Sequence, residues 1–471
     1  MSVEVFDVIV IGSGPGGQKA ALQAARADKR VLIVEEEAHV GGACVHTGTI
    51  PSKTLRETAV VLGSFAARTG NVVECNLPSH VTLASLMTRK DEVIHGHHEY
   101  LAAELAHGDV TRWHGRGSFE SPHEVLVRTL QGERRLARAD VIVIATGSHP
   151  RVPTDIVVDH EHVLDSDSIL SMTYLPASLV VLGAGVIASE YASIFASLGV
   201  AVTMVDGGAR PCSMLDPELT SCFVSSLTRR GGRFIAGQKA AKVEWDGVAD
   251  VVTTLTGGEV LRSERVLFAL GRVARLEGLN VDAAGLQPTG RGLLEVDAHC
   301  RTAVPHIYAV GDVIGPPALA ATSMEQGRRA MCHAFGLPVG QPATTIPFAV
   351  YTIPEMSSVG LSEAEAIAST GGARVGRASF GAVARGQIAA IQDGLLKLVA
   401  DAEGKRVLGV QVVGEGAAEL VHLGQLALLT GASVDLFIDN IYNFPTMAEA
   451  YRVAALDIAA QRRLLPSAGA G

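Results

Sequence analysis

One pattern occurs twice in this chain, and it restricts the fold more than any other feature. Each copy reads as a buried strand, a glycine-rich turn, a helix, a second strand and a closing acid. The first copy has its turn at Gly12-Ser-Gly-Pro-Gly-Gly17, and the second has it at Gly183-Ala-Gly-Val-Ile-Ala188. The acids are Glu35 and Asp206, so the first glycine and the acid are 23 positions apart in both copies. Such units build parallel, doubly wound sheets, and we therefore predict an α/β chain with two Rossmann-like domains.

Each glycine of the turn has a physical task in binding a dinucleotide. The first allows a tight turn, the second lets the backbone approach a pyrophosphate, and the third lets helix pack on strand. The helix N-terminus favours the phosphates, and the acid accepts ribose hydroxyls. The cofactor-binding residues expected in the first unit are Gly12, Ser13, Gly14, Pro15, Gly16, Gly17, Glu35 and Glu36; those in the second are Gly183, Gly185, Val186, Ile187 and Asp206, with Ala188 a permitted third position.

Further glycine turns divide the chain into domains. Thr146-Gly147 closes the first unit and Gly271-Arg272 closes the second. Residues 12 and 183 are 171 positions apart whereas 147 and 271 are 124 apart, so the first unit contains about 47 additional residues. After the second unit a buried strand ends in Gly311-Asp312, which returns the chain to the first domain, followed by a helix near Ala320. We expect cofactor contacts at Gly117, Thr146, Gly147, Gly271, Arg272, Gly311, Asp312 and Ala320.

These turns predict the domain bounds. Residues 1–150 form the first part of one nucleotide domain, 151–271 form the other, and 272–341 complete the first. From residue 342, strand-like runs such as 344–351 and 409–414 alternate with helices, which predicts a C-terminal α+β domain. Alternation at Glu124-Val-Leu-Val-Arg and the charged run Arg134-Arg-Leu-Ala-Arg predict an exposed β-ribbon.

The additional residues of the first unit include Gly41-Gly-Ala-Cys-Val-His-Thr-Gly-Thr-Ile-Pro-Ser-Lys53. This segment, the two glycine turns, Gly311-Asp312 and the C-terminal Pro-Thr-Met-Ala-Glu-Ala-Tyr-Arg resemble, in the same order, motifs of the pyridine nucleotide-disulfide oxidoreductases, the family of glutathione reductase and lipoamide dehydrogenase. The resemblance covers nearly the whole chain. It implies FAD in the first domain, NAD(P)H in the second and a homodimer, or larger homo-oligomer, formed by residues 342–471.

The sequence departs from this family at two positions that serve the same chemistry. Family members carry two cysteines that form a disulfide over the flavin; here Cys44 fills the first position and Thr49 the second. A hydroxyl cannot close a disulfide, so this segment cannot perform disulfide exchange. The family's proton-shuttling histidine before Pro-Thr is replaced by Phe444, whose ring cannot transfer a proton.

In these departures the chain resembles the soluble, FAD-containing pyridine nucleotide transhydrogenases, a group within the family that carries threonine in place of the second cysteine. The resemblance implies that hydride passes from NADPH to flavin N5 and then to NAD, with ping-pong turnover. It also implies that Lys53 pairs with Glu190 beside the flavin. The candidate catalytic residues are Lys53, Glu190, Cys44 and Thr49. For Cys44 and Thr49 the simpler interpretation is that they only pack beside the flavin. The residues expected to contact cofactor also include Gly42, Cys44, Lys53 and Glu190.

The acid of the second unit bears on nucleotide preference. Asp206 suits the 2′-hydroxyl of NAD and repels the 2′-phosphate of NADP. Arg210, four residues on, offers a cation for that phosphate. We expect NAD(H) to bind at least as well as NADP(H).

Two alternatives stay open: an NAD(P)H:quinone or dye reductase, and a flavin-bound redox sensor with negligible turnover. Net charge −10 argues against nucleic acid and anionic membranes as partners. The sixteen histidines, His46 among them, and six cysteines show no metal-ligand spacing. The cysteines other than Cys44 are expected to be core or surface residues. No signal peptide or spanning run is recognised, so we expect a cytoplasmic protein.

Overall fold

The computed structural model of the chain describes residues 2–69, 83–391 and 393–463. Its contacts divide the chain into two compact units, which we describe separately. Unit 1 comprises residues 1–54, 84–152 and 271–341, and unit 2 comprises residues 55–83, 153–270 and 342–471.

Unit 1 is built on a mixed seven-stranded sheet. Strands β3, β2, β1, β6 and β17 run parallel, and β5 and β4 extend the sheet in antiparallel fashion from β6. The bounds of the strands are β1 (Val3–Ile11), β2 (Val31–Glu35), β3 (Thr111–His114), β4 (Arg116–Ser121), β5 (Glu124–Arg128), β6 (Arg134–Ile144) and β17 (Ile307–Ala309). A two-stranded ribbon of β7 (Ser148–Pro150) and β16 (Arg272–Ala274) joins the closing turns of the two repeats.

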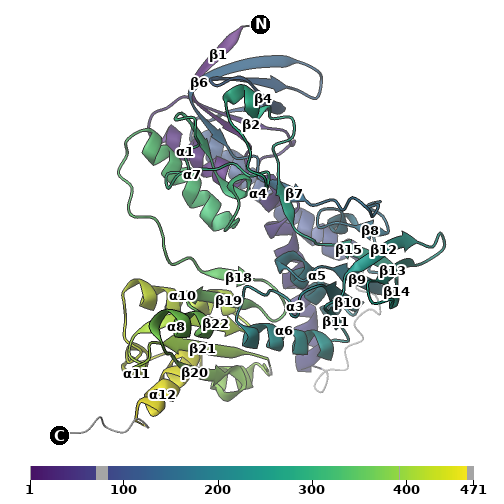
Figure 1. Ribbon diagram of the computed structural model, residues 1–471, viewed down its shortest axis with the longest axis vertical. Coiled ribbons are helices and arrows are strands. Elements are labelled where there is room, and N and C mark those ends of the chain that lie inside the picture. Colours follow the sequence, from purple (N-terminus) through teal and green to yellow (C-terminus); the bar gives the residue numbers. More distant parts are fainter. Residues whose placement is uncertain (1, 70–82, 392, 464–471) are drawn as a thin grey trace. The chain divides into compact units, whose positions relative to one another are not determined.

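Two helices lie side by side on one face of this sheet, α1 (Pro15–Ala25) and α7 (Ala320–Ala334) (Figure 1). They touch closely, since a methyl group on Gly327 would lie 2.1 Å from the Gly16 carbonyl oxygen. Their apolar side chains form one core cluster with the strands and with α4 (Leu83–His107). The remaining helical segments of unit 1 are α2 (Gly42–His46), the start of α3 (Thr49–Thr69), η2 (Val281–Ala284) and η3 (Gly311–Ile314).

Unit 2 contains a five-stranded sheet in which every pairing is parallel, in the order β11-β10-β9-β15-β8. The bounds of its elements are β8 (Val163–Leu164), η1 (Ser168–Ser171), β9 (Ser178–Leu182), α5 (Val186–Ser197), β10 (Ala201–Asp206), α6 (Pro217–Arg229), β11 (Arg233–Ala236) and β15 (Arg265–Phe268). A three-stranded antiparallel sheet follows β11, with β12 (Ala240–Trp245), β13 (Val251–Leu255) and β14 (Val260–Ser263).

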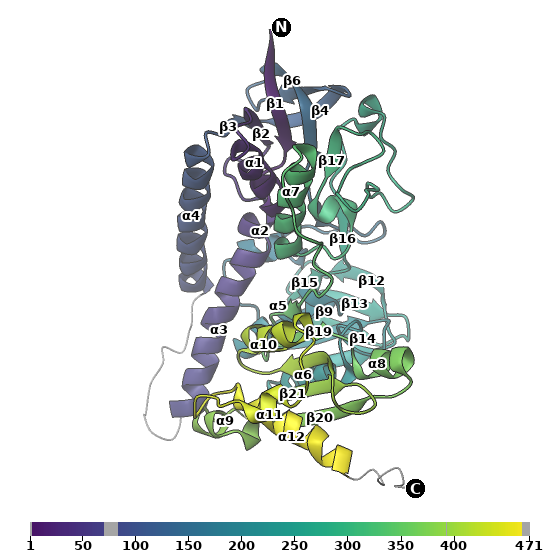
Figure 2. The ribbon, with the colours of Figure 1, turned by 90° about the vertical axis from the view of Figure 1, so that its left-hand side faces the viewer.

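The C-terminal part of unit 2 is an antiparallel sheet in the order β18-β19-β22-β21-β20. Helix α10 (Ala417–Leu429) packs on β22 and β19, and α12 (Glu449–Arg463) packs on β20 and β21 (Figure 2). The remaining bounds are β18 (Phe348–Val350), β19 (Met356–Gly360), α8 (Glu363–Thr370), β20 (Arg374–Ser379), η4 (Phe380–Ala382), α9 (Ala384–Ile388), β21 (Leu395–Ala400), β22 (Val407–Val413) and α11 (Leu436–Asp439).

The predicted fold class is confirmed: two Rossmann-like sheets, one mixed and one with parallel pairings, are accompanied by a C-terminal α+β domain. Two local predictions were wrong. The strand expected at 344–351 is only β18, Phe348–Val350. The expected ribbon forms, because β5 pairs with the start of β6, but its β5 strand is not exposed: Val125, Leu126 and Val127 are at most 3% exposed.

Candidate functional site

The first glycine turns of the two units have the same geometry. Gly12 and Gly183 have φ angles of +100° and +111°, in the region that favours glycine. A methyl group on Gly12 would lie 2.3 Å from the carbonyl oxygen of Ala145, and one on Gly183 would lie 2.5 Å from that of Ala269. Both carbonyls precede a closing glycine turn. The two sequence repeats therefore form the same tight turn, which packs against the strand end before a closing glycine turn.

The start of α1 suits a pyrophosphate. Gly14 is its N-cap residue and Pro15 its first residue, and no side chain caps this end among the described residues. A methyl group on Gly14 would have its nearest neighbour 4.0 Å away, whereas one on Gly17 would lie 2.0 Å from the Gly12 oxygen. Space at Gly14 and contact at Gly17 match the expected tasks of the two residues. The backbone N–H groups at this end of the helix can donate hydrogen bonds to an anion.

The acid of the first repeat is held by this same turn. Glu35 is 5% exposed, and its Oε2 accepts from the Ser13 backbone N–H at 2.8 Å. Its Oε1 accepts from the Glu37 N–H at 2.9 Å. The neighbouring Glu36 carboxylate pairs with the Arg275 guanidinium. The Glu35 carboxylate is thereby fixed at the carboxyl end of β2, where a ribose hydroxyl would be bound.

Side chains from three segments meet beside the closing turn of unit 1. Arg272 donates to the Ser148 hydroxyl at 2.8 Å, and that hydroxyl donates to Asp312 at 2.6 Å. The Gly311 N–H donates to the Gln326 side chain at 2.9 Å. The Thr146 hydroxyl is buried and has no partner among the described residues. A buried hydroxyl without a partner beside a glycine cradle fits a bound polar ligand such as FAD.

Cys44 and Thr49 are in contact, although they cannot form a disulfide. Cys44 lies in the short helix α2, and Thr49 is the first residue of α3. Burial raises the pKa of the Cys44 thiol, while a hydrogen bond from Thr49 and the charge of Lys53 oppose that rise only in part. The thiol therefore stays protonated at neutral pH. Thr49 thus stands where the family has its second cysteine, and its hydroxyl forms a hydrogen bond with the Cys44 thiol instead of a disulfide.

Gly42 brings this segment close to the first glycine turn. Its φ is +58°, and a methyl group on it would lie 2.7 Å from the Cα atom of Gly14. The Lys53 ammonium lies 3.4 Å from the Ser52 hydroxyl. Unit 1 therefore gathers the phosphate turn, Cys44, Thr49 and Lys53 in one region.

Two other predicted residues of unit 1 have packing contacts, and a third begins a helix. Gly16 faces α7 and Val310. Gly117 is buried in β4 against Ile11 and Val34. Ala320 is the first residue of α7.

The second turn opens α5. Gly185 is the N-cap residue, no described side chain caps it, and Val186 and Ile187 are the first residues of the helix. Ala188 is fully buried at the third glycine position. The helix end is open to an anion in the same way as in the first repeat.

Glu190 is buried in α5, and its Oε1 accepts from the Tyr351 backbone N–H at 2.8 Å. Three residues on, the Ser193 hydroxyl accepts from the Ile353 N–H at 3.0 Å. The segment before β19 is therefore attached to α5 within unit 2.

The acid and the arginine of the second repeat have different partners. Oδ1 of Asp206 accepts from the Gly208 N–H at 2.7 Å. The Arg210 guanidinium donates to the carbonyls of Leu215 at 2.8 Å and Ser213 at 2.6 Å. The arginine that the sequence suggested for the 2′-phosphate thus holds its own loop.

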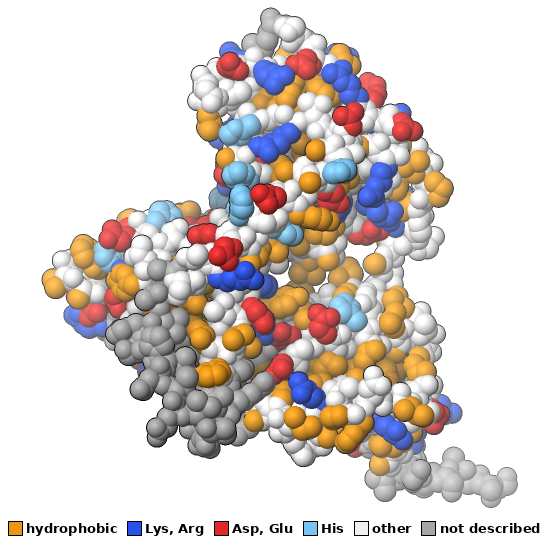
Figure 3. All heavy atoms as spheres, turned by 180° about the vertical axis from the view of Figure 1, so that it is seen from behind, with side chains coloured by type: hydrophobic (Ala, Val, Ile, Leu, Met, Phe, Trp, Pro, Cys, Tyr) orange, Lys and Arg blue, Asp and Glu red, His pale blue; other side chains and the backbone are white. Residues whose placement is uncertain are grey.

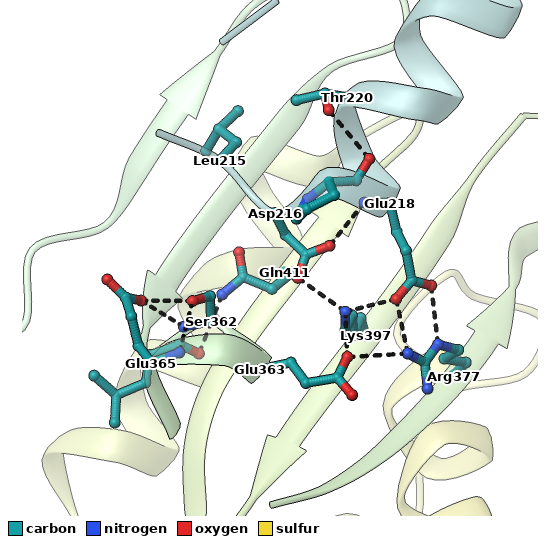
Figure 4. A network of polar contacts seen from close by, with 12 residues as sticks. Leu215, Asp216, Glu218, Thr220, Ser362, Glu363, Glu365, Arg377, Lys397 and Gln411 are labelled. Carbon is teal, nitrogen blue, oxygen red and sulfur yellow. Dashed lines mark hydrogen bonds and ion pairs between the residues drawn. The ribbon is translucent and has the colours of Figure 1, made fainter. Parts of the chain in front are cut away.

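Several charged groups escaped the sequence analysis. Lys397, 3% exposed at its side chain, contacts three carboxylates, which belong to Asp216 at 2.8 Å, Glu218 at 2.6 Å and Glu363 at 2.8 Å (Figure 4). Arg377 pairs with Glu218 at 2.7 Å and with Glu363 at 3.1 Å. The pairing arises from tertiary contacts between α6, α8, β20 and β21, so spacing along the chain gives no signal for it.

Histidine side chains gather on one face of unit 1 (Figure 3). The rings of His39 and His46 lie 4.7 and 4.8 Å from that of His98. Burial and the neighbouring histidines lower the pKa of His98 to about 4. Among the described residues, no group of three or more His, Cys, Asp or Glu side chains is arranged to hold a metal ion.

The cysteines other than Cys44 that the structure describes are free thiols, as expected. Cys212, Cys300 and Cys332 are buried and Cys222 is half-buried, while Cys75 lies outside the described residues. Phe444, at the position of the family's histidine, is 75% exposed in this single chain.

Comparison with known proteins decides the family. The model of the family described as "Pyridine nucleotide-disulphide oxidoreductase" matches residues 6–327, and that of its dimerisation domain matches residues 346–455. The chain belongs to the pyridine nucleotide-disulfide oxidoreductases. It is therefore an oxidoreductase of a family that uses FAD and NAD(P)H, and it carries that family's dimerisation domain.

Relatives within the pyridine nucleotide-disulfide oxidoreductases extend over nearly the full chain. A protein of Mycobacterium bovis named soluble pyridine nucleotide transhydrogenase is 43% identical and covers 98% of each chain. One of the same name from Marinomonas is 38% identical, over 97% of this chain and 99% of its own. The crystal structure of LpdA from Mycobacterium tuberculosis is 27% identical with a TM-score of 0.88, over 98% and 100% of the two chains. No helix in the described ranges is both long and apolar enough to cross a membrane.

Proposed function

We propose that this protein is an FAD-dependent, Si-specific NAD(P)+ transhydrogenase that moves hydride between NADPH and NAD+ without a redox-active disulfide. The observation that carries the proposal is the Cys44–Thr49 pair: a protonated thiol hydrogen-bonded to a hydroxyl cannot accept an electron pair by disulfide exchange. The full-length likeness to proteins named soluble pyridine nucleotide transhydrogenase supports the same conclusion. Bound FAD supplies a two-electron centre at N5 that accepts hydride from one nicotinamide and returns it to another.

The residues of unit 1 would hold FAD. In this proposal residues 1–150 and 272–341 form the FAD domain, in which the α1 N-terminus at Gly14 binds the pyrophosphate and Glu35 binds the ribose. Asp312, which accepts from the Ser148 hydroxyl, would accept hydrogen bonds from hydroxyls of the ribityl chain. The unpartnered Thr146 hydroxyl gains a partner from the cofactor. The other cofactor residues proposed here are Ser13, Pro15, Gly16, Glu36, Gly42, Cys44, Gly117, Gly147, Gly271, Arg272, Gly311 and Ala320.

The nicotinamide substrates would use residues 151–271. The α5 N-terminus, with Gly185, Val186 and Ile187, binds the pyrophosphate, and Asp206 binds the adenosine ribose. Lys53 of unit 1 and Glu190 of unit 2 are the proposed charged catalytic groups. Lys53 would offset negative charge on the cofactor when it is bound, and the Glu190 carboxylate is held by the Tyr351 N–H. Thr49 and Cys44 shape the region without exchanging electrons.

Hydride transfer between two nicotinamides moves no proton to or from the protein, so no acid–base residue is required. This explains how the chain functions with Phe444 in place of histidine. We further propose a homodimer through residues 342–471 and a cytoplasmic location.

Steady-state kinetics under argon test the proposal. NADPH is varied at several fixed concentrations of the thionicotinamide analogue of NAD+, whose reduced form absorbs at a longer wavelength than NADPH. We expect parallel double-reciprocal lines, because one nucleotide leaves before the next binds. A quinone that is reduced far faster than the NAD+ analogue would refute transhydrogenation and identify a quinone reductase. No turnover with either acceptor would identify the redox sensor.

A further inference from the structure

The proposed function requires unit 2 to accept NADP(H) as well as NAD(H), and this inference rests on that requirement. The 2′-phosphate of NADP(H) would meet Asp206 at the end of β10. β11 pairs with β10 in parallel, and Ala236 is the register partner of Asp206. The turn at residues 237–239 therefore lies at the same carboxyl edge of the sheet. This is the edge where doubly wound folds bind nucleotides.

Three other cations, on the loop after β10, on β11 and on β12, already have partners among the described residues. The Arg210 guanidinium donates to Leu215, Ser213 and, at 3.3 Å, the Thr220 hydroxyl, which attaches the loop to α6. Arg233 pairs with Glu259 at 2.8 Å. Lys242 pairs with Glu244 at 2.7 Å. Using any of them for a phosphate would break an existing interaction.

Lys239 is placed differently. Its ammonium has no carboxylate within 4 Å among the described residues. Its alkyl stem lies over Gly207, the residue after Asp206: a methyl group on Gly207 would lie 2.7 Å from the lysine Cε and 3.3 Å from its Cγ. The lysine therefore crosses the surface directly beside the acid.

The backbone around Lys239 is fixed. The Gln238 N–H donates to the Asp206 carbonyl at 3.1 Å, and the Thr256 N–H donates to the Lys239 carbonyl at 2.9 Å. The Lys239 N–H donates to the Thr256 hydroxyl at 3.3 Å. An exposed lysine side chain thus extends from a backbone that hydrogen bonds hold to Asp206 and Thr256.

We propose that Lys239 is the residue that binds the 2′-phosphate of NADP(H). With NAD(H), Asp206 accepts the ribose hydroxyl through Oδ2, since Oδ1 is occupied by the Gly208 N–H. With NADP(H), the Lys239 ammonium binds the phosphate and offsets the repulsion between the phosphate and Asp206. A lysine beside a fixed acid lets one site accept both substrates, and Gly207 leaves the space that the lysine stem needs.

Equilibrium titration of the holoenzyme with NADP+ and with NAD+ tests this assignment without requiring turnover. Lys239→Gln is expected to raise the Kd for NADP+ by about tenfold or more, as for loss of a charged hydrogen bond, and to leave the Kd for NAD+ within about twofold. Lys239→Arg is expected to retain NADP+ binding. Gly207→Ala, which displaces the lysine stem, is expected to weaken NADP+ binding selectively. Lys242→Gln, the nearby paired lysine, is the control and should change neither.

Two results would overturn the assignment. One is an unchanged Kd for NADP+ in Lys239→Gln. The other is an equal loss for both nucleotides, which indicates a structural role. These results differ from failure of the proposed function, which shows in the acceptor kinetics of the unmodified enzyme.

Discussion

Replacing Lys397 with methionine is predicted to destabilise unit 2 strongly. Methionine keeps the length of the side chain but removes the ammonium that contacts three carboxylates. Burial alone would lower the pKa of Lys397, but these carboxylates outweigh it and raise the pKa, so the lysine is charged in the folded protein. The variant leaves Asp216, whose side chain is 2% exposed, as a buried carboxylate without a counterion.

The size of the loss follows from which carboxylates stay paired. Arg377 remains bonded to Glu218 and Glu363, so the uncompensated charge is mainly that of Asp216. Breaking a buried ion pair costs about 3–5 kcal/mol. For a unit of this size we expect a fall in Tm of roughly 6–10 °C.

The assay is thermal unfolding of the holoenzyme, with two further variants. Asp216→Asn combined with Lys397→Met should recover much of the loss, because asparagine keeps an oxygen to accept the Glu218 N–H that Asp216 now binds at 2.9 Å. Lys405→Met, an exposed lysine before β22, should leave the Tm within about 2 °C. A small fall in Lys397→Met, or an equal fall in Lys405→Met, would refute the reasoning.

Three further predictions concern pH and the FAD region. The hydrogen bond from Arg377, together with Lys397, lowers the pKa of Glu218 from 4.5 to about 2. The stability that the ionised Glu218 contributes is therefore complete above about pH 4.5 and is lost as the pH falls toward 2. Glu218→Gln should flatten this part of a curve of stability against pH. Cys44→Ala should change the rates of flavin reduction and reoxidation less than about threefold, since the protonated thiol exchanges no electrons. The Gly14→Ala variant should fold but bind FAD weakly. In Gly17→Ala the new methyl group would lie 2.0 Å from the Gly12 oxygen, so this variant should have lower yield and stability. Circular dichroism and the flavin content of the purified proteins distinguish the two outcomes.

Much of the fold could be predicted because its signals are local. The turn at Gly12, its counterpart at Gly183 and the acids that follow them arise from backbone geometry within about 25 residues. The β5 strand was misjudged because an alternating pattern predicts one exposed face. Val125 and Val127 share a core cluster with apolar residues of the segment after β16, and Leu126, which points to the other face, is buried as well.

The charged groups were less predictable, because the partner of a long side chain depends on tertiary structure. Arg210 follows Asp206 closely in sequence, yet its guanidinium turns toward Leu215. Lys239 is 33 positions from Asp206 and becomes its neighbour only through the pairing of β10 with β11. The contact between Cys44 and Thr49, in contrast, follows from their spacing across the α2–α3 turn.

The most direct test of the central claim is stopped-flow spectroscopy of the flavin under argon. The purified enzyme is reduced with one equivalent of NADPH and then mixed with NAD+. The account predicts rapid bleaching and then reoxidation by NAD+ at a rate at least equal to steady-state turnover. Rapid bleaching followed by reoxidation by NAD+ that is slower than turnover with a quinone would contradict it.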